Sequence, residues 1–583
     1  MQVSTVVSPV AEQKSGLKSI VFSPTFFLIA VTFVLLPLAL VKTIPIPLGA
    51  MFWDQYLYID AANRIADGQV PAIDFFAPVG ALGYYLFAGW LKIFPEGAIL
   101  LLASWSLLAV TAPSLALVLY CVQKRSRATA WALLLPFLLF SILPFNTAEF
   151  YPFPGTDGFG IYNRQICQLL YVLAAALCFL RAPALLGIVV TLTMLALLFV
   201  KVTGVVSGVL LCLMAFAAGR LPLRVAIAAG LAFFLSIGLI EITTGVVSAY
   251  AEDMIALLVM NDTSLLPRLL QGASINFGIM ASAAGLAVVL LVSDRHKLAT
   301  DWKRFRNAPG FASAAQLLDQ NWLWLAVFLL AGLLFESQNT GSQAFIFLWP
   351  LILSILIRKH REDGTSTGLM VAGILALAAM LPPVVEITQR AARSAVGSVN
   401  DIVLQHRNLK TLGTISLRPV FATRAERMHP NYIAHRETYE EIVRNGELPA
   451  NLLYSDFDFF WLWMQTMDDA IDAIKAYEAD HGMRFDTIMS IDFSNPFPWL
   501  MDRRAPHAIA IGADPFRAVP PPDDKVAAAV AAVDLALLPT CPPTTARWSL
   551  LGLYEPFLKQ GHTRIKLTSC YDAFVRDALV NKQ

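Results

Sequence analysis

The chain has 583 residues, of which 57% are hydrophobic and only 15% are charged, and its mean hydropathy is +0.61. These values exclude an ordinary soluble protein, and a net charge of +1 provides no field that would attract nucleic acid. We therefore expect a polytopic α-helical membrane protein, because the segments crossing lipid must satisfy their own backbone hydrogen bonds.

Uncharged apolar runs close to the roughly 20 residues that cross a bilayer recur along the first two thirds of the chain. They predict about eleven transmembrane helices, near residues 25–44, 98–121, 128–145, 165–181, 184–200, 203–219, 225–247, 275–293, 321–336, 342–357 and 368–388. Lys14 and Lys18 precede the first run, which lacks a small-residue cleavage site. This pattern predicts a retained anchor and not a cleaved signal peptide.

The distribution of Lys and Arg predicts the orientation, because basic residues gather in cytoplasmic loops. Of the 22 basic residues before residue 390, 16 fall in loops that we assign to the cytoplasm and 6 in outer loops. Residues 80–94 are apolar but short and contain glycines, and counting them as a span would place the basic cluster at 124–127 outside. We therefore interpret 80–94 as a re-entrant or interfacial helix. Residues 45–97 and 146–164 are then outer loops.

The first outer loop opens with an acidic residue, Asp54, directly after the first span. One face of the following helix is apolar and the other carries Asp60, Arg64 and Asp67, so we expect an amphipathic helix on the membrane surface with Asp60 facing water. Asp54 has two interpretations. It could be the N-cap of this helix, or a general base held at the lipid boundary.

The second outer loop carries two acids, Glu149 and Asp157, followed by Asn163 and Arg164. Arg164 lies just before the fourth span, where its planar guanidinium could hold a lipid phosphate. The alternative is that Arg164 binds no ligand and only extends its guanidinium group to the membrane–water interface.

Lys201 interrupts a stretch of about 35 otherwise uncharged residues at a tight connection between two spans, where an ionisable group is costly unless it is paired or used. A lysine at a hairpin tip is the simple alternative. Further polar residues, namely Glu241 and the group Glu336, Gln338 and Asn339, lie at the outer ends of later spans. They are candidates for the same cavity.

The composition changes near residue 390, after which the chain holds 21 of its 43 basic residues and no run long enough to cross a membrane. This predicts a transmembrane domain over 1–389 and a C-terminal soluble α/β domain over 390–583 on the outer side. We expect helices over 468–481 and 525–532 and strands over 487–493, 508–512 and 534–539. The aromatic run 457–463 is favoured as core or packing surface over a sugar-binding platform.

Cys541 and Cys570 are the only cysteines of the C-terminal region, and an oxidising compartment would permit a disulfide between them. The sequence leaves open whether the two sulfurs meet. The six histidines of this region show no metal-ligand spacing, and no glycine-rich nucleotide loop is present. We therefore predict no metal site and no cofactor, although a divalent metal would be compatible with the loop acids.

The first outer loop also resembles that of a known superfamily. The runs Asp54-Gln55-Tyr56-Leu57-Tyr58, Ala61-Ala62, Gly68-Gln69-Val70-Pro71 and Asp74-Phe75-Phe76, with Pro78, are similar to the first outer loop of the GT-C membrane glycosyltransferases. The nearest branch contains protein mannosyltransferases and the aminoarabinose transferases of lipid A. In that superfamily the loop acid is the proposed base, and the donor is a sugar carried on polyprenyl phosphate. Many members have a second acid where this chain has Gln55, which weakens any metal argument.

The resemblance implies an inverting glycosyltransferase, a hexosyl- or pentosyltransferase, in a bacterial cytoplasmic (inner) membrane, with the C-terminal domain on the periplasmic side. Asp54 would be the catalytic base, and Lys201 with Arg164 would bind the donor phosphate. The expected supporting residues are Gln55, Tyr58, Asp74, Glu149, Asp157, Asn163, Glu336 and Asn339.

The expected partners are the lipid-linked donor, membrane lipid, and a glycan, lipid or protein acceptor, with no nucleic acid. The competing function is a lipid-linked sugar flippase or polysaccharide transporter, which should carry polar residues at midspan and internal repeats. The charges of this chain cluster instead at the outer ends of the predicted spans, and we detect no repeat. A membrane sensor that displays the α/β domain would leave the acid-bearing loop unexplained.

Overall fold

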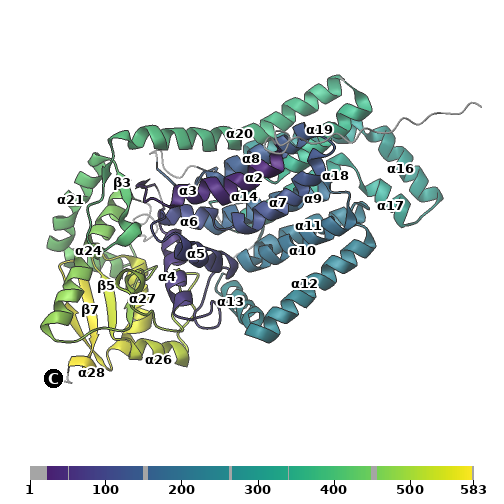
Figure 1. The fold of residues 1–583 in the computed structure, drawn as a ribbon. Coiled ribbons are helices and arrows are strands. Elements are labelled where there is room, and N and C mark those ends of the chain that lie inside the picture. The colour runs from purple at the N-terminus through teal and green to yellow at the C-terminus, as the bar shows by residue number, and fades with distance from the viewer. Residues whose placement is uncertain are drawn as a thin grey trace, which may run out of the picture.

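The computed structural model describes residues 23–49, 51–148, 155–261, 265–338, 341–364, 366–447 and 456–580. Within these ranges the chain forms a large helical bundle, with a region of mixed helices and strands at one end of it (Figure 1). Lys14, Lys18, Glu149 and Asn339 lie outside the described residues.

The helical part runs from residue 24 to residue 400. Its elements are α2 (Pro24–Ala30), η1 (Val31–Leu35), α3 (Leu36–Leu40), β1 (Ile46–Pro47), α4 (Asp54–Ala66), α5 (Leu82–Ile93), α6 (Ile99–Trp105), α7 (Leu108–Gln123), α8 (Arg127–Ile142), α9 (Ile161–Phe179), α10 (Pro183–Val200), α11 (Val202–Ala217), α12 (Leu223–Thr244), α13 (Val246–Met260), α14 (Leu265–Ile275), α15 (Phe277–Ser293), α16 (Arg295–Asn307), α17 (Phe311–Leu318), α18 (Asn321–Glu336), α19 (Leu348–Asp363), α20 (Thr367–Gly397) and η2 (Ser398–Asn400).

Each of the eleven predicted membrane segments contains a helix. By length and composition, four helices could cross a membrane: Ile99–Gln123, Pro183–Val200, Leu223–Thr244 and Thr367–Asn400. Two bent pairs, α14 with α15 and α17 with α18, raise this number to as many as six among the described residues. The protein is therefore a multi-pass membrane protein, and the count of eleven spans stays a prediction.

Helix α5 occupies the segment that the sequence predicts to be re-entrant or interfacial. It has 12 residues, so it is about 18 Å long, well short of the roughly 30 Å of a hydrocarbon core. It packs against α4. Its length agrees with the prediction that residues 80–94 do not span the membrane.

Helix α4 differs from the sequence prediction. Asp60 and Arg64 are 1% and 0% exposed, and Arg64 Nε donates to Asp60 Oδ1 at 2.8 Å. Arg64 also donates to the carbonyl oxygen of Pro506 at 2.6 Å, because a C-terminal segment covers the polar face of the helix. The prediction that Asp60 faces water is wrong, and α4 is not a half-exposed surface helix.

The remaining elements lie in the C-terminal part of the chain. They are β2 (Ile402–Val403), η3 (Lys410–Gly413), β3 (Ile415–Leu417), α21 (Pro419–Ala434), α22 (Arg436–Arg444), α24 (Phe457–Asp480), β4 (Ile488–Ser490), α25 (Phe497–Met501), α26 (Asp524–Ala532), β5 (Leu535–Pro539), α27 (Thr545–Leu558), β6 (His562–Lys566), β7 (Tyr571–Arg576) and α28 (Asp577–Val580).

A four-stranded sheet in the order β4-β5-β7-β6 is the centre of this part. Strand β4 is parallel to β5, with Ile488 opposite Leu535, and the other pairs are antiparallel. The predictions of β4, β5, α26 and the end of α24 are confirmed, and the apolar side chains of residues 457–463 are buried in α24 as expected of core. Strands β6 and β7 were not predicted.

The predicted strand at 508–512 is absent. The backbone N–H groups of Ala508 and Ile511 donate to the carbonyl oxygens of Asp74 and Phe76 in the first loop. Ala508 has a φ of 62°, which is incompatible with a regular strand. This segment is therefore irregular because it binds the first loop and not a neighbouring strand.

Two further contacts join the helical part to the C-terminal part. Strand β1 pairs in parallel with β3, with Ile46 opposite Ile415. Helix α20 continues without a break through residue 389, where the sequence suggests a domain boundary. One hydrophobic core extends through both parts, and the division into two domains stays a prediction.

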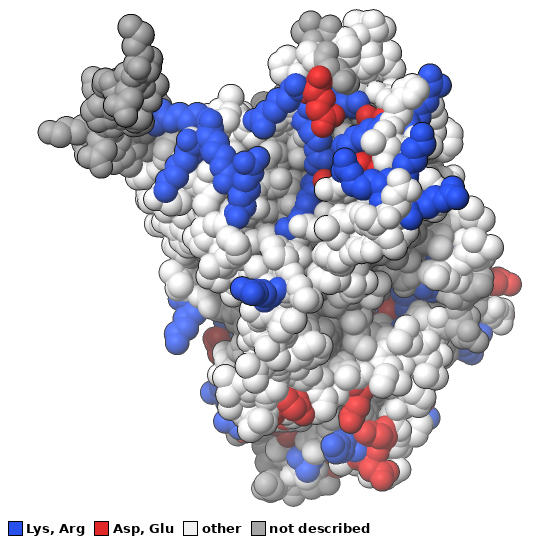
Figure 2. Space-filling view, turned by 90° about the vertical axis from the view of Figure 1, so that its right-hand side faces the viewer, with Lys and Arg blue, Asp and Glu red and all other residues white. Residues whose placement is uncertain are grey.

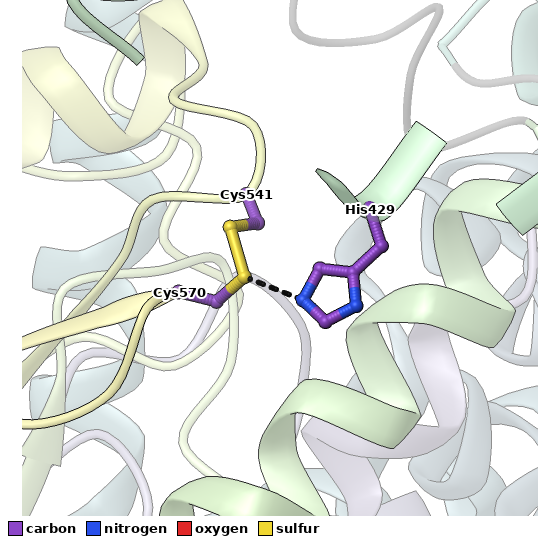
Figure 3. Close-up of side chains that lie close together, drawn as sticks. All are labelled: His429, Cys541 and Cys570. Atoms are coloured by element: carbon purple, nitrogen blue, oxygen red, sulfur yellow. Dashed lines mark hydrogen bonds between the residues drawn. A yellow bond between two sulfur atoms is a disulfide. The ribbon is translucent and has the colours of Figure 1, made fainter. Parts of the chain in front are cut away.

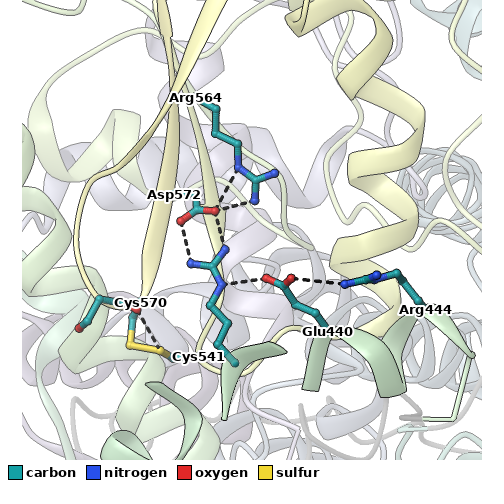
Figure 4. A network of polar contacts seen from close by, with 8 residues as sticks. Glu440, Arg444, Cys541, Arg564, Cys570 and Asp572 are labelled. Carbon is teal, nitrogen blue, oxygen red and sulfur yellow. Dashed lines mark hydrogen bonds and ion pairs between the residues drawn. A yellow bond between two sulfur atoms is a disulfide. The ribbon is translucent and has the colours of Figure 1, made fainter. Parts of the chain in front are cut away.

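Cys541 and Cys570 form a disulfide, with His429 Nε2 at 3.2 Å from Cys570 Sγ (Figure 3). Near it, Asp572 of β7 accepts hydrogen bonds from Arg564 of β6 and from Arg436 of α22, and Arg436 also pairs with Glu440 (Figure 4). These contacts attach α22 to the sheet.

Candidate active site

A cavity of about 370 Å³ lies where α4 and the ends of α10 and α13 meet the C-terminal part. Its polar lining residues are Asp54, Lys201, Thr203, Asn261, Arg268, Gln338, Asp514 and Arg517. Its apolar lining includes Trp53, Leu57, Pro78, Val79, Met254, Leu257, Leu258 and Phe493. The cavity thus combines one unusually placed carboxylate with several cations and an apolar wall.

Asp54 is the first residue of α4, and the N-cap position belongs to Trp53, which makes no side-chain cap. The Asp54 carboxylate instead accepts a hydrogen bond at 2.6 Å from the backbone N–H of Gly160, in the second outer loop. Gly160 has a φ of 68°, and a Cβ there would lie 2.0 Å from the carbonyl oxygen of Gly341. Only glycine fits this position. The interpretation of Asp54 as an N-cap is therefore wrong.

The surroundings of Asp54 change its acidity. Its side chain is almost fully buried, and this burial raises its pKa to about 6. The hydrogen bond from Gly160 and the charges of Arg164, Lys201 and Arg517 act in the opposite direction. The carboxylate is thus mostly ionised at neutral pH but has a much higher proton affinity than a surface aspartate, as a general base requires.

Lys201 lies in extended backbone between α10 and α11. Its Nζ donates to Asn163 Oδ1 at 3.1 Å and lies 5.0 Å from the centre of the Tyr162 ring. Burial lowers the pKa of Lys201 to about 8, and the charge of Asp54 raises it. Lys201 is therefore part of the cavity wall and not a solvated hairpin tip.

Arg164 is buried behind the wall and does not line the cavity. One guanidinium nitrogen donates to the carbonyl oxygen of Asp157 at 3.4 Å, and Nη1 has no hydrogen-bond partner among the described residues. Its charge acts on Asp54. The prediction that Arg164 binds phosphate stays a prediction, and its position favours an electrostatic role toward Asp54.

Two other cations line the cavity, Arg268 of α14 and Arg517 of the C-terminal part. Arg517 pairs with Asp514 at 2.7 Å. The sequence places Arg268 in an outer loop without giving it a role, and nothing near Arg517 in the sequence connects it to the first loop. Arg517 reaches the cavity wall only because two segments that are far apart in the sequence lie side by side in the fold.

Several predicted supporting residues lie outside the cavity wall. Asp157 accepts hydrogen bonds from Arg390 at 2.8 Å and from the backbone N–H of Asn146 at 2.7 Å. Asp74 accepts one from the N–H of Val70 at 2.7 Å. Both acids therefore hold loop backbone in place.

Gln55, Tyr58, Glu241 and Glu336 also lie outside the wall. Tyr58 contacts Gln165 and the Tyr84 ring, and Gln55 is buried. Glu336 accepts from Ser342 Oγ at 2.5 Å. Glu241 binds Ser248 near the start of α13, so the hypothesis that it lines the cavity is wrong.

His429, Cys541 and Cys570 are the one group of three potential metal ligands found in the described ranges. Its two sulfurs form the disulfide of Figure 3 and are not free thiolates. This group therefore offers a single imidazole ligand.

No protein family model and no curated protein matches the sequence. Among solved structures, ArnT from Cupriavidus metallidurans bound to undecaprenyl phosphate is similar at 13% identity and a TM-score of 0.38, covering 94% of this chain and 97% of that one. The Archaeoglobus fulgidus oligosaccharyltransferase tethered with an acceptor peptide is similar at 12% identity and a TM-score of 0.33, covering 94% and 74%. Both are GT-C glycosyltransferases. Both TM-scores lie below 0.5.

Proposed function

We propose that this protein is an inverting glycosyltransferase that moves a sugar from a polyprenyl-phosphate carrier to an acceptor hydroxyl, on the outer side of a bacterial cytoplasmic membrane. One observation carries the proposal. Asp54, a buried carboxylate with a raised pKa, faces the same cavity as the cation of Lys201. The motif around Asp54 that resembles the GT-C first loop supports the same reaction.

Asp54 would act as the general base. A sugar hydroxyl is a poor nucleophile near neutral pH, so a carboxylate within hydrogen-bond reach must take its proton as the new bond forms. The acceptor oxygen attacks the anomeric carbon, the bond from that carbon to the phosphate oxygen breaks, and the configuration inverts. The electron pair of the broken bond leaves with the polyprenyl phosphate, and the proton remains on Asp54.

Lys201 would stabilise the negative charge that grows on the departing phosphate. Its position between Asn163 and the Tyr162 ring holds the ammonium group at the wall. Arg268 and Arg517 also line the cavity, and the charge of Arg517 is shared with Asp514. We therefore assign the main phosphate contact to Lys201 and an auxiliary one to Arg268.

The apolar wall fits a lipid-linked donor. Leu257 and Leu258 of α13 line the cavity, and the Leu258 side chain is also 74% exposed on the outside of the bundle. An isoprenoid chain could therefore leave the cavity along the exposed face of α13 while its phosphate stays inside. This arrangement would let the donor enter from the membrane.

The C-terminal part would shape the acceptor side. Residues Gly512, Ala513 and Ala518 form the part of the wall that faces α4. The two charged wall residues of this segment, Asp514 and Arg517, pair with each other, and we assign neither of them a step of the transfer. We infer that changes in this segment alter the choice of acceptor and leave the base in place.

The test is a transfer assay with the purified full chain and a panel of synthetic polyprenyl-phosphate sugars, measuring the release of polyprenyl phosphate. Asp54→Asn should express normally and still bind donor, because the amide oxygen can accept the Gly160 N–H. Its turnover should fall at least about 100-fold.

Asp74→Asn is the control, because Asp74 lies outside the cavity wall and we expect a milder loss there. Transfer at the wild-type rate by Asp54→Asn would contradict the proposed base. If the wild-type protein moves lipid-linked sugars across vesicle membranes without breaking the sugar–phosphate bond, the transporter alternative is correct.

A further inference from the structure

Two adjoining cavities lie at the opposite end of the bundle from the candidate active site. They have volumes of about 300 Å³ and 240 Å³ and share three lining residues, Cys178, Arg181 and Arg358. Lys201 follows the last residue of α10, whereas these cavities lie around its first residue, Pro183. The helix of 18 residues separates the two ends by about 27 Å.

Five arginines line this pair of cavities: Arg125, Arg181, Arg220, Arg358 and Arg361. The distribution of Lys and Arg assigns this end to the cytoplasm, and Figure 2 shows basic side chains gathered in the upper part of the face that carries it. A bias toward basic cytoplasmic loops explains the sign of the charge. That bias does not explain why five arginines line the same pair of cavities.

The arginines are only partly neutralised. Asp319 pairs with Arg220 at 2.8 Å and with Arg358 at 3.5 Å. Within the described ranges, the side chains of Arg181 and Arg361 take part in no ion pair or hydrogen bond. The paired cavities therefore carry an excess of positive charge and two guanidinium groups that are available to a ligand.

We propose that this pair of cavities binds the phosphate headgroup of an anionic phospholipid from the inner leaflet. A guanidinium presents a planar set of donors that matches phosphate oxygens, and arginines on both sides of one space can bind the same group. The chemistry would select a headgroup with net negative charge over a zwitterionic one.

The apolar surface next to the cavities points to a lipid and not to a soluble anion. Leu186 and Pro222 line the first cavity. The next residues along the same two helices include exposed apolar side chains, Ile188 on α10 and Leu223 and Ile227 on α12. Helices α10 and α12 pack against each other. Acyl chains could lie along this continuous apolar face while the phosphate stays between the arginines.

The proposal is tested by native mass spectrometry of the delipidated full chain, titrated with phosphatidylglycerol or with phosphatidylcholine of the same acyl chains. The variants are Arg181→Gln and Arg181→Gln/Arg361→Gln, which remove no side-chain hydrogen bond or ion pair among the described residues. Lys303→Gln/Arg306→Gln on α16 is the matched control, because it removes two exposed charges that do not line either cavity.

We expect preferential binding of phosphatidylglycerol, weakened about fivefold by the single substitution and more than tenfold by the double one, because each basic residue near the surface contributes about that much. The control should bind as the wild type does. Equal phosphatidylglycerol affinity in the wild type and the double variant would overturn the proposal, as would equal binding of the two lipids. Displacement of bound phosphatidylglycerol by inorganic phosphate would assign the cavities to a soluble anion instead.

Discussion

The carboxylate of Asp54 accepts a 2.6 Å hydrogen bond from the backbone N–H of Gly160, a residue 106 positions further along the chain. The bond uses one side of the carboxylate and fixes its direction, because the glycine is held in a left-handed conformation against Gly341. The second outer loop therefore orients the proposed base of the first.

The pH dependence of transfer should be bell-shaped. Asp54 must be ionised to accept a proton, so kcat/KM should fall as the pH drops below about 6. Lys201 must be protonated to stabilise the phosphate, so kcat/KM should fall as the pH rises above about 8. Because the two charges interact, these values belong to the pair.

The assignment of the fall in kcat/KM at high pH to Lys201 can be checked with Lys201→Arg. Arginine stays charged across the accessible pH range, so the loss of activity at high pH should disappear in this variant. A basic limb that persists unchanged would belong to another group.

Lys201→Ala should impair donor binding and turnover more than Lys201→Arg does, since the contribution is a positive charge near a forming anion. Loss of such a group costs about 100-fold or more in rate, and steady-state kinetics with a synthetic donor would measure it. Arg268→Ala should cause a smaller loss. Wild-type kinetics in both Lys201 variants would return this residue to a structural role.

Asp60→Asn should destabilise the protein without removing a catalytic group. The substitution leaves the buried guanidinium of Arg64 without its counter-charge, which costs about 3 to 5 kcal/mol for a fully buried pair. Thermal unfolding of the detergent-solubilised protein should show the loss, whereas Asp67→Asn, at the exposed end of the same helix, should not. Equal melting temperatures for Asp60→Asn and the wild type would show that the pair contributes little.

The disulfide between Cys541 and Cys570 should stabilise the C-terminal part. Cys541→Ser/Cys570→Ser should lower the free energy of unfolding by about 2 to 5 kcal/mol, the usual cost of losing a native disulfide. A reducing agent should have the same effect on the wild type and none on the variant. Free thiols at both positions in the unfolded wild-type protein would show that the bond does not form in the cell.

The orientation of the first loop can be tested by cysteine labelling in a background without free cysteines. If 80–94 does not span, a reporter near Gly97 is labelled from outside the cell and one near Ser126 only after permeabilisation. Labelling of Gly97 only from the inside would show that this segment crosses the membrane and would reverse the assigned topology.

Features that depend on a local pattern could be predicted from the sequence. The membrane helices follow from uncharged runs, and Asp54 and Lys201 stand out because each is an isolated charge beside such a run. The structure then brings these two residues to one cavity. The sequence offers Cys541 and Cys570 as the candidate pair of the C-terminal region but leaves the bond open, and the structure shows that the two sulfurs meet.

Features that depend on contacts between distant segments could not be predicted from the sequence. Arg64 looks like a solvated residue of an amphipathic helix, and only its hydrogen bond to Pro506 shows that it is buried. Arg517 reaches the cavity through a segment more than 400 residues from Asp54. Strand β6 alternates weakly, because most of its side chains are exposed at the edge of the sheet.

The parallel pairing of β1 with β3 joins residues 46–47 to residues 415–416. During synthesis, at about 5 to 20 residues per second, the first loop therefore emerges long before the strand that completes its sheet. The wall residues around Gly512 are made later still. The chain cannot assemble its candidate active site while the membrane helices are still being inserted, so this cavity is a late product of biosynthesis that is completed only after the segment through Ala546 has been made.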